Sequence, residues 1–311
     1  MRLLLLGCSG FVGRALVPYL LELGHGLTVV SRRHQPFPPL AADRIKCLTL
    51  DPADPASWQQ DSLREALAAA EGVVNLVGEP IAERRWTPEH RQLLRDSRVR
   101  STELLVAAIR ELSSPPSVLV SGSAVGYYGS SSEARFSEDS PAGADFLGQL
   151  CRDWEAAAAA VPPDCRLVIL RLGIVLGADG GALGKMLPVF RAGFGGPVGS
   201  GRQWMSWIDR HDLCRLIATA LEDSTYSGPY NAVAPDATTM GEFAVALGRT
   251  LGRPSLLPVP GAILQLLLGD GAKVVLEGQR VVPDRLRAQG FSFSYPDLSA
   301  ALAAATNPGR R

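Results

Sequence analysis

Over residues 1–172, short apolar runs alternate with longer stretches in which apolar side chains recur at helical spacing. The apolar runs predict buried strands at Leu3–Leu6, Leu27–Ser31, Ile45–Leu50, Gly72–Val77, Val118–Ser121 and Leu167–Leu170. The longer stretches predict helices at Phe11–Leu23, Ser57–Ala70, Pro88–Leu112 and Asp145–Ala160. Strands that are apolar throughout favour a parallel sheet covered on both faces, and their alternation with helices favours right-handed βαβ units.

After Leu172 the alternation breaks down, and glycine and proline become dense, above all at 193–201. The elements still predicted there are helices at Arg210–Leu221 and Thr239–Leu251 and a strand at Tyr230–Val233. The whole pattern predicts an α/β protein with a doubly wound parallel sheet and a smaller C-terminal substrate lobe. We assign 1–172, completed by about 208–233, to the sheet domain, and 173–207 and 234–311 to the smaller lobe.

Composition narrows the classes of partner and compartment. The chain has 31 Lys and Arg residues against 31 Asp and Glu residues, so net charge favours neither nucleic acid nor an anionic membrane. The 5 cysteines include no Cys-x-x-Cys pair, which disfavours a disulfide framework or a zinc site and fits a reducing compartment. The run Leu3–Leu6 is shorter than the roughly 7–15 residues of a signal-peptide core. We expect a cytoplasmic protein, or one from an organelle matrix without its transit peptide.

The first predicted strand leads directly into a Gly-x-x-Gly-x-x-Gly turn that opens a predicted helix. In such a turn the first glycine permits a tight reversal, the second lets the backbone approach a pyrophosphate, and the third lets helix and strand pack closely. We therefore predict a dinucleotide site formed by Gly7, Ser9, Gly10, Phe11, Val12 and Gly13. The alternative is a glycine-rich turn with a purely structural role.

The end of the second predicted strand indicates which dinucleotide is bound. NAD sites carry an acidic residue there for the ribose 2′-hydroxyl. This chain has Ser31, Arg32 and Arg33 instead, and no acidic residue follows until Asp43. Two guanidiniums and a hydroxyl suit a 2′-phosphate, so we predict NADP(H), the alternative being a solvated pair of arginines.

Two further strand ends are candidates for coenzyme contact. Asp51 follows the third predicted strand, at a place that often faces the adenine. The fourth predicted strand ends in Asn75, Leu76, Val77 and Gly78, which we expect beside the ribose and nicotinamide. An asparagine at a strand end can equally serve only to cap a turn, so for Asn75 the two interpretations stay open.

These residues resemble the extended branch of the short-chain dehydrogenase/reductase superfamily, and other motifs narrow the resemblance. The chain is similar to an atypical "epimerase family", whose members are sugar-nucleotide-epimerase-like and sometimes labelled cell-division inhibitors. The motifs are Leu76-Val77-Gly78-Glu79-Pro80-Ile81, Arg85-Trp86, Asp96-Ser97-Arg98-Val99, Ser121 to Gly129, Leu170-Arg171-Leu172-Gly173, Ser206-Trp207-Ile208-Asp209 and Asn231 to Pro235. The segment from Val259 to Pro296 resembles that family's C-terminal domain of unknown function. The resemblance implies a Rossmann fold with NADP(H).

The acid–base pair of that superfamily is absent. Active members place Tyr-x-x-x-Lys on the helix after the fifth strand, where the ammonium lowers the pKa of the phenol. The only lysines are Lys46, Lys185 and Lys273, and none is preceded by tyrosine at that spacing. On the expected helix, Phe146 and Leu150 are candidates for the two positions.

The resemblance implies that Ser123 is the catalytic serine. The loop after it carries Tyr127 and Tyr128, either of which is a candidate catalytic acid over the nicotinamide. The alternative for both tyrosines is aromatic packing against coenzyme or substrate.

The candidate substrate residues are Arg98, Lys185, Arg202 and Trp204. Arg98 fits the family pattern, whereas Arg202 and Trp204 follow a flexible glycine loop that could form a lid. For Lys185 a surface role is an equal alternative. The 4 histidines show no metal-ligand spacing, so no metal is predicted, and Asp209 is interpreted as a helix N-cap.

Two functions are consistent with these residues. One is an NADP(H)-dependent oxidoreductase or epimerase that acts on a small or nucleotide-linked substrate through a nonstandard acid. The other is an NADP(H)-binding sensor or regulatory protein without turnover, for example in cell division. The expected partners are a small-molecule substrate and a second copy of the chain, with no nucleic acid and no membrane; the resemblance implies dimerisation through Pro88–Leu112 and Asp145–Ala160.

Overall fold

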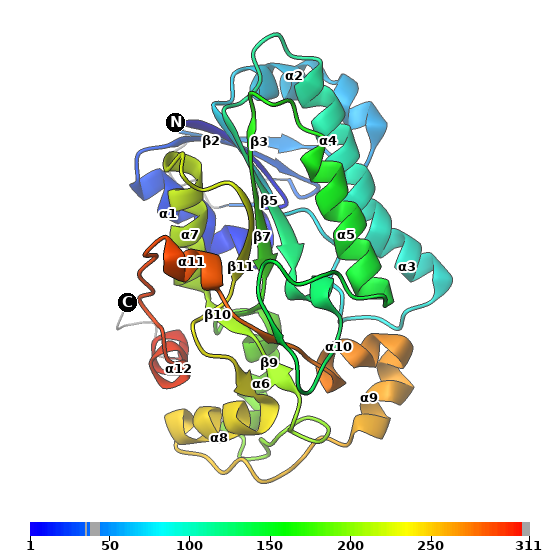
Figure 1. Cartoon of the computed structure of the whole chain (residues 1–311), viewed down its shortest axis with the longest axis vertical. Helices are drawn as coiled ribbons and strands as arrows, with labels where there is room; N and C mark the ends of the chain where they lie inside the picture. Colours follow the sequence, from blue (N-terminus) through cyan, green and yellow to red (C-terminus); the bar gives the residue numbers. More distant parts are fainter. Residues whose placement is uncertain (35, 38–43, 307–311) are drawn as a thin grey trace.

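A seven-stranded parallel sheet in the order β11-β7-β5-β4-β1-β2-β3 forms the centre of the computed structural model, which describes residues 1–34, 36–37 and 44–306 (Figure 1). The strands are β1 (Arg2–Leu6), β2 (Gly26–Ser31), β3 (Ile45–Thr49), β4 (Gly72–Asn75), β5 (Val118–Ala124), β7 (Arg166–Leu172) and β11 (Gly228–Ala232). β1 pairs with β2 on one side and β4 on the other, so the strand order reverses at β1. Open α/β sheets bind ligands beyond the strand ends at such a point. The predicted fold class is confirmed.

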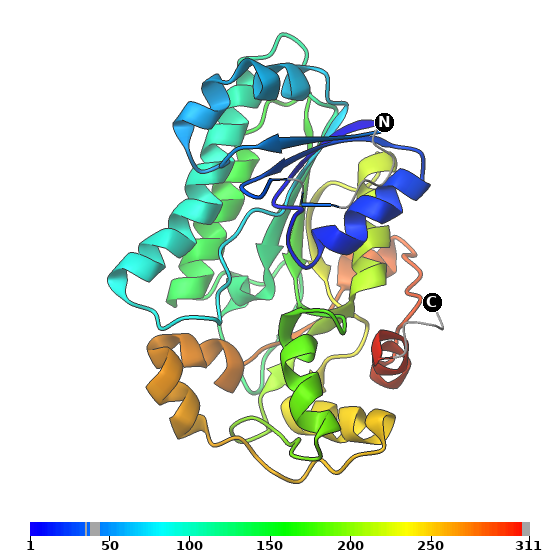
Figure 2. The same cartoon turned by 180° about the vertical axis from the view of Figure 1, so that it is seen from behind.

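Helices cover both faces of the sheet (Figures 1 and 2). One face carries α1 (Gly13–Glu22) and α7 (Arg210–Glu222); the other carries α2 (Asp61–Ala68), α4 (Ser101–Arg110) and α5 (Phe146–Ala159). Successive side chains of a strand point to opposite faces. Leu3 and Leu5 accordingly lie in the core beneath α1 and α7, and Leu4 and Leu6 lie in the core beneath α2 and α4. This division explains why β1 is apolar at every position after Arg2.

The predicted helix Pro88–Leu112 is interrupted by a wider turn. It consists of α3 (Pro88–Arg95), the π-helical turn η2 (Asp96–Arg100) and α4, and it begins at Thr87, whose hydroxyl accepts from His90 N–H. The wide turn presents Ser97 and Arg98 to the loop after β4, where they hydrogen-bond the backbone N–H and C=O of Glu79. π-Helical turns are frequent at functional sites because they change where side chains point.

Other helix boundaries agree with the prediction, with one correction. The expected helix Ser57–Ala70 is divided into a 3₁₀ turn, η1 (Pro55–Gln59), and α2. The division arises because Asp54 caps the turn and Pro55 starts it. The Asp209 carboxylate accepts from His211 N–H at 2.7 Å, so the predicted N-cap of α7 is confirmed.

Segments after β7 build a second core beside the carboxyl ends of the strands (Figure 1). They contain β8 (Ile174–Leu176), α6 (Gly181–Arg191), β9 (Trp204–Met205), β10 (Trp207–Asp209), β12 (Thr238–Thr239), α8 (Met240–Leu251), α9 (Gly261–Leu268), η4 (Gly269–Ala272), α10 (Lys273–Leu276) and α12 (Leu298–Thr306). A further pair joins β6 (Arg135–Phe136) to β13 (Arg280–Val281).

The tail is not confined to this smaller lobe. α11 (Asp284–Ala288) returns to the central sheet, where Leu286 joins the core beneath α7 and Arg285 hydrogen-bonds the carbonyl of Pro229 in β11. The end of the expected lobe, 307–311, lies outside the described residues. Over the described part of the chain, no helix has both the length and the apolar character needed to cross a bilayer.

Candidate functional site

The glycine turn joins β1 to α1, and the protein itself crowds two of its three glycines. Gly7 has φ +75°, and a β-carbon there would overlap the backbone of Leu76 and Val77, just after β4. A β-carbon at Gly13 would overlap the backbone of Cys8. Both glycines are therefore required by contacts within the chain.

Gly10 differs, because its surroundings leave room for a side chain. A β-carbon there would meet only the carbonyl oxygen of Gly7, at 3.6 Å, which is an ordinary contact. No side chain caps the start of α1. The N–H groups of Arg14 and Ala15 already donate to the carbonyls of Gly10 and Val12, so the donors left for an anion are those of the turn before them. An open face at Gly10 together with uncapped N–H donors fits a bound pyrophosphate.

The predicted 2′-phosphate residues follow β2 directly. The Ser31 hydroxyl is buried and accepts from Arg33 N–H at 3.0 Å, which fixes the turn. The Arg32 guanidinium is two-thirds exposed and forms a 3.7 Å ion pair with the carboxylate of Glu79. Arg32 and Arg33 thus directly follow β2, the strand that pairs with β1 beside the glycine turn.

Asp51 and Asn75 have local hydrogen-bonding roles. The Asp51 carboxylate accepts from Ala53 N–H at 3.0 Å. Asn75 is buried; its amide donates to Thr102 Oγ1 at 2.9 Å and accepts from Val77 N–H at 3.3 Å. Asn75 therefore shapes the segment Leu76–Gly78 that packs against Gly7, which is the turn-capping role left open from the sequence.

Ser123, at the end of β5, belongs to a buried ionic network. Its hydroxyl donates to Glu155 Oε1 at 2.6 Å, and the Glu155 carboxylate also accepts two bonds from Arg171, at 2.9 and 2.8 Å. Burial alone would lower the pKa of Arg171, but the Glu155 carboxylate outweighs it and holds that pKa above its ordinary value. Because the one proton of Ser123 goes to Glu155, its oxygen is left to accept hydrogen bonds.

Tyr128 lies inside the same network. Its hydroxyl donates to Asn231 Oδ1 at 2.6 Å and accepts from Arg171 at 2.8 Å, and its side chain is buried. Burial raises the pKa of Tyr128 to about 12, although Arg171 opposes this shift. This phenol is enclosed by its neighbours.

Tyr127, one residue earlier, lies on the outer side of the network. Its ring covers the Arg171 guanidinium, whose central carbon is 3.6 Å from the ring centroid. The residue is half-buried, and its hydroxyl has no hydrogen-bond partner among the residues the structure describes. Of the two predicted tyrosines, Tyr127 is thus the one whose hydroxyl is open to a ligand.

The face of α5 that meets Ser123 differs by one position from the one expected. Phe146 and Leu150 pack away from Ser123, in a cluster with Leu94 and Trp154. The facing residues are instead Leu147, which lies over Gly126, and then Cys151 and Glu155, both in contact with Ser123. Burial raises the pKa of the Cys151 thiol to about 12. The tyrosine and lysine positions are therefore apolar or neutral here.

The four predicted substrate residues are not gathered in one place. Arg98 lies under Gly78, donates to the carbonyls of Leu94 and Glu79, and stacks on Trp154, so its contacts hold the π turn to the loop after β4. Lys185 on α6 forms an exposed 3.0 Å ion pair with Glu83. The Arg202 side chain is exposed.

Trp204 is held within the smaller lobe. Its indole donates to the carbonyl of Ser132 at 2.9 Å, and Arg280 stacks on its ring.

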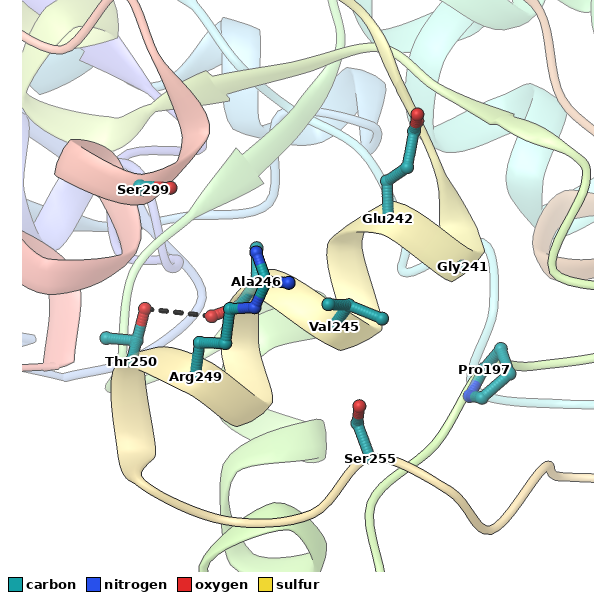
Figure 3. Close-up of a pocket in the computed structure, with 9 residues that line it drawn as sticks. All are labelled: Pro197, Gly241, Glu242, Val245, Ala246, Arg249, Thr250, Ser255 and Ser299. Atoms are coloured by element: carbon teal, nitrogen blue, oxygen red, sulfur yellow. Dashed lines mark hydrogen bonds between the residues drawn. The ribbon is translucent and has the colours of Figure 1, made fainter.

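One cavity of the described structure lies away from this chemistry. Its volume is about 760 Å³, and it runs along α8 between Pro197 and Ser299 (Figure 3). Its lining contains none of the predicted site residues. Within the described residues, no group of three or more His, Cys, Asp or Glu side chains could hold a metal ion.

Sequence reasoning missed the acidic and cationic partners of Ser123. Glu155 was visible only as an acid inside an alanine-rich helix, and Arg171 only as part of a family motif. Glu138 and Asn231 complete the network: Glu138 accepts from Asn231 N–H, and its carbonyl accepts from Arg171. The signal that could have found Arg171 is a charged residue that directly follows the apolar run Leu167–Leu170.

A parallel sheet with a glycine turn at its switch point and Ser123 at the end of β5 defines a dinucleotide-binding protein of short-chain dehydrogenase type. Residues 3–232 match the NAD dependent epimerase/dehydratase family, and residues 259–305 match a domain of unknown function (DUF1731). The chain belongs to the NAD dependent epimerase/dehydratase family.

Its relatives are similar over nearly their whole length. It is 42% identical over 96% of its length to the chloroplastic SDR39U1 homologue of Arabidopsis thaliana, covering 84% of that protein. It is 40% identical to the Homo sapiens epimerase family protein SDR39U1, covering 97% of this chain and 98% of that one. The crystal structure of human SDR39U1 (isoform 2) with NADPH superposes with a TM-score of 0.86 at 39% identity, covering 99% of both chains.

Proposed function

We propose that this chain binds NADP(H) and uses it to exchange a hydride with a small or nucleotide-linked substrate, as an oxidoreductase or epimerase. The uncapped start of α1, the open face at Gly10 and the arginines after β2 support the coenzyme. The human relative crystallised with NADPH supports the same choice.

The observation that carries the proposal is the position of Tyr127 on Arg171. The Arg171 guanidinium lies on the face of the half-buried Tyr127 ring just after β5, with its central carbon 3.6 Å from the ring centroid. The stacked cation holds the ring in place and leaves the hydroxyl free to reach a substrate, as a general acid must. Arg171 comes from β7 rather than from the tyrosine's own helix.

Each residue then has a defined task. NADP(H), when bound, supplies or accepts the hydride. The Tyr127 hydroxyl gives its proton to the substrate oxygen as a carbonyl becomes an alcohol, and takes it back in the reverse direction. Ser123 accepts a hydrogen bond from the substrate hydroxyl, because its own proton is donated to Glu155. Tyr128 and Glu155 are positioning residues that hold Arg171 in place.

The substrate-side roles follow from exposure. Arg202 is exposed and available to a negatively charged substrate group, and Lys185 is exposed but must first leave Glu83. Trp204 would act within the smaller lobe, where Ser132 and Arg280 hold its ring. Arg98 acts indirectly, by holding the loop after β4. We also propose that the chain forms a homodimer and acts in the cytoplasm.

The test is NADPH oxidation with a panel of aldehydes, ketones and nucleotide sugars, comparing wild type with Tyr127→Phe. We expect the variant to bind NADPH normally and to lose at least about 100-fold in kcat, because general acid catalysis contributes roughly 10²–10⁴-fold. Tyr19→Phe is the control, since Tyr19 lies on α1 and packs edge-on against His211. Full activity in Tyr127→Phe would remove Tyr127 from the mechanism.

A second candidate, an NADP(H)-binding regulatory protein without turnover, is favoured by one observation. The face of α5 that meets Ser123 carries Leu147 and Cys151, and neither side chain has a positive charge that would lower the pKa of a catalytic acid. This candidate predicts tight NADPH binding, no oxidation by any member of the panel, and protection of bound NADPH against a small chemical oxidant. An oxidoreductase leaves the nicotinamide accessible to such an oxidant.

A further inference from the structure

Arg32 and Glu79 form an ion pair across the end of β1. Arg32 directly follows β2, and Glu79 follows β4, the strands on either side of β1. Their guanidinium nitrogen and carboxylate oxygen are 3.7 Å apart. The pair therefore spans the strand end from which the glycine turn leaves, where the adenosine half of a dinucleotide would lie.

The two partners differ in how firmly they are held. The Glu79 side chain is only 17% exposed, whereas that of Arg32 is 67% exposed. The Glu79 backbone is fixed on both sides, since its N–H donates to Ser97 Oγ at 3.1 Å and its carbonyl accepts from Arg98 at 2.9 Å. The π turn η2 supplies both of these contacts, so the carboxylate stays in place while the arginine can move.

We propose that Glu79 is a specificity-determining residue that holds Arg32 when no coenzyme is bound and gives it up to the 2′-phosphate of NADP(H). This inference rests on the proposed NADP(H) binding. A phosphate monoester carries a charge of about −1.5 to −2, whereas a carboxylate carries −1, so the phosphate binds the Arg32 guanidinium more strongly than Glu79 does. The exchange has a cost, because an ion pair is broken and Glu79 is left near the phosphate.

NADH lacks the 2′-phosphate, so it carries no group there that competes with Glu79 for Arg32. Glu79 therefore lowers the affinity for NADP(H) and leaves the affinity for NAD(H) unchanged. It sets the size of the discrimination that Arg32 creates. Glu79 also favours coenzyme release, because its carboxylate can pair with Arg32 again as the phosphate leaves.

Calorimetric titration of wild type and Glu79→Gln with NADPH and with NADH tests this inference. We expect Glu79→Gln to bind NADPH about two- to fivefold more tightly, the range set by the strength of an ion pair with one exposed partner, with NADH affinity unchanged. Because Ser97 and Arg98 bind the backbone of residue 79, the variant keeps its local structure. Glu83→Gln is the matched control, as Glu83 lies in the same loop but pairs with Lys185.

A second titration places Glu79→Gln in an Arg32→Ala background. If Glu79 acts through Arg32, most of the gain disappears in the double variant. The inference is overturned if Glu79→Gln leaves NADPH affinity unchanged, if NADH gains equally, or if the gain persists without Arg32. If wild type binds NADPH and Glu79→Gln binds it equally well, only this inference is contradicted. If wild type binds neither dinucleotide, the proposed function is overturned as well.

Discussion

Gly10 and Gly13 of the coenzyme turn are glycine for different physical reasons, and alanine substitution at each position distinguishes the two reasons. Gly13→Ala puts a β-carbon into the backbone of Cys8, so we expect roughly 1–3 kcal/mol or more of lost stability. Gly10→Ala meets only an ordinary contact, so we expect normal stability but at least about tenfold weaker NADPH binding. Thermal unfolding and calorimetry measure the two effects.

Gly26→Ala controls for the loss of a glycine as such, because a β-carbon at Gly26 would meet nothing within 4 Å. A folded Gly10→Ala variant that binds NADPH like wild type would show that the coenzyme does not lie against this part of the turn.

At single residues, the sequence predicted what depends on near neighbours in the chain. The glycine turn and the caps Thr87 and Asp209 lie within a few residues of their partners, and their roles follow from local backbone geometry. The partner of Arg32 was not predicted, because Glu79 is brought to it by the order of three strands. Long-range ion pairs of this kind leave no local pattern.

Among the secondary-structure elements, α5 carries the residue on which the buried network depends. Glu155→Gln leaves the Arg171 guanidinium without its charge partner; both side chains are nearly buried, at 11% and 4% exposed. We expect about 3–5 kcal/mol of lost stability. Asp153→Asn on the same helix removes the surface pair with Arg95, and we expect less than about 1 kcal/mol. Urea unfolding compares the two variants, and equal effects would contradict a network that depends on Glu155.

The positions of helices were predicted more accurately than their orientation. The helix 145–160 was found within one residue at each end, yet the side chains that face Ser123 are Leu147 and Cys151 rather than Phe146 and Leu150. A shift of one residue turns a helix by about 100°, which is the difference between facing a site and facing a core. The π turn at Asp96–Arg100 was missed because no residue type specifies it.

For the whole molecule, buried acids make stability fall in alkaline solution. Burial raises the pKa of the Cys8, Cys151 and Tyr128 side chains to about 12, and that of Cys165 to about 11. The unfolded chain loses these protons from about pH 8.5 for cysteine and about pH 10 for tyrosine, while the folded chain keeps them. Stability is therefore complete below about pH 8.5 and is lost as pH rises toward 12.

Guanidinium unfolding at pH 8, 9 and 10 measures this loss. We expect the free energy of unfolding to fall with pH, and the fall to be shallower in Cys151→Ala by up to about 1.4 kcal/mol per pH unit. A free energy that stays flat from pH 8 to 10 would show that the thiols have the same pKa in the folded and unfolded protein.

The aromatic ring of the coenzyme turn determines where the molecule can open. Phe11 lies under Gly177, Gly180 and Gly181, where β-carbons would come within 2.6–3.0 Å of the ring, and Arg210 stacks over it at 4.7 Å. The two cores are thus joined closely beside the turn. The chain after β4 meets the smaller lobe at the exposed Lys185–Glu83 pair, and also at η4 through Trp86 and Arg91. Exposed ion pairs separate at little cost, and a packed ring does not. We therefore expect any opening between the two cores to hinge at Phe11 and to separate Lys185 from Glu83.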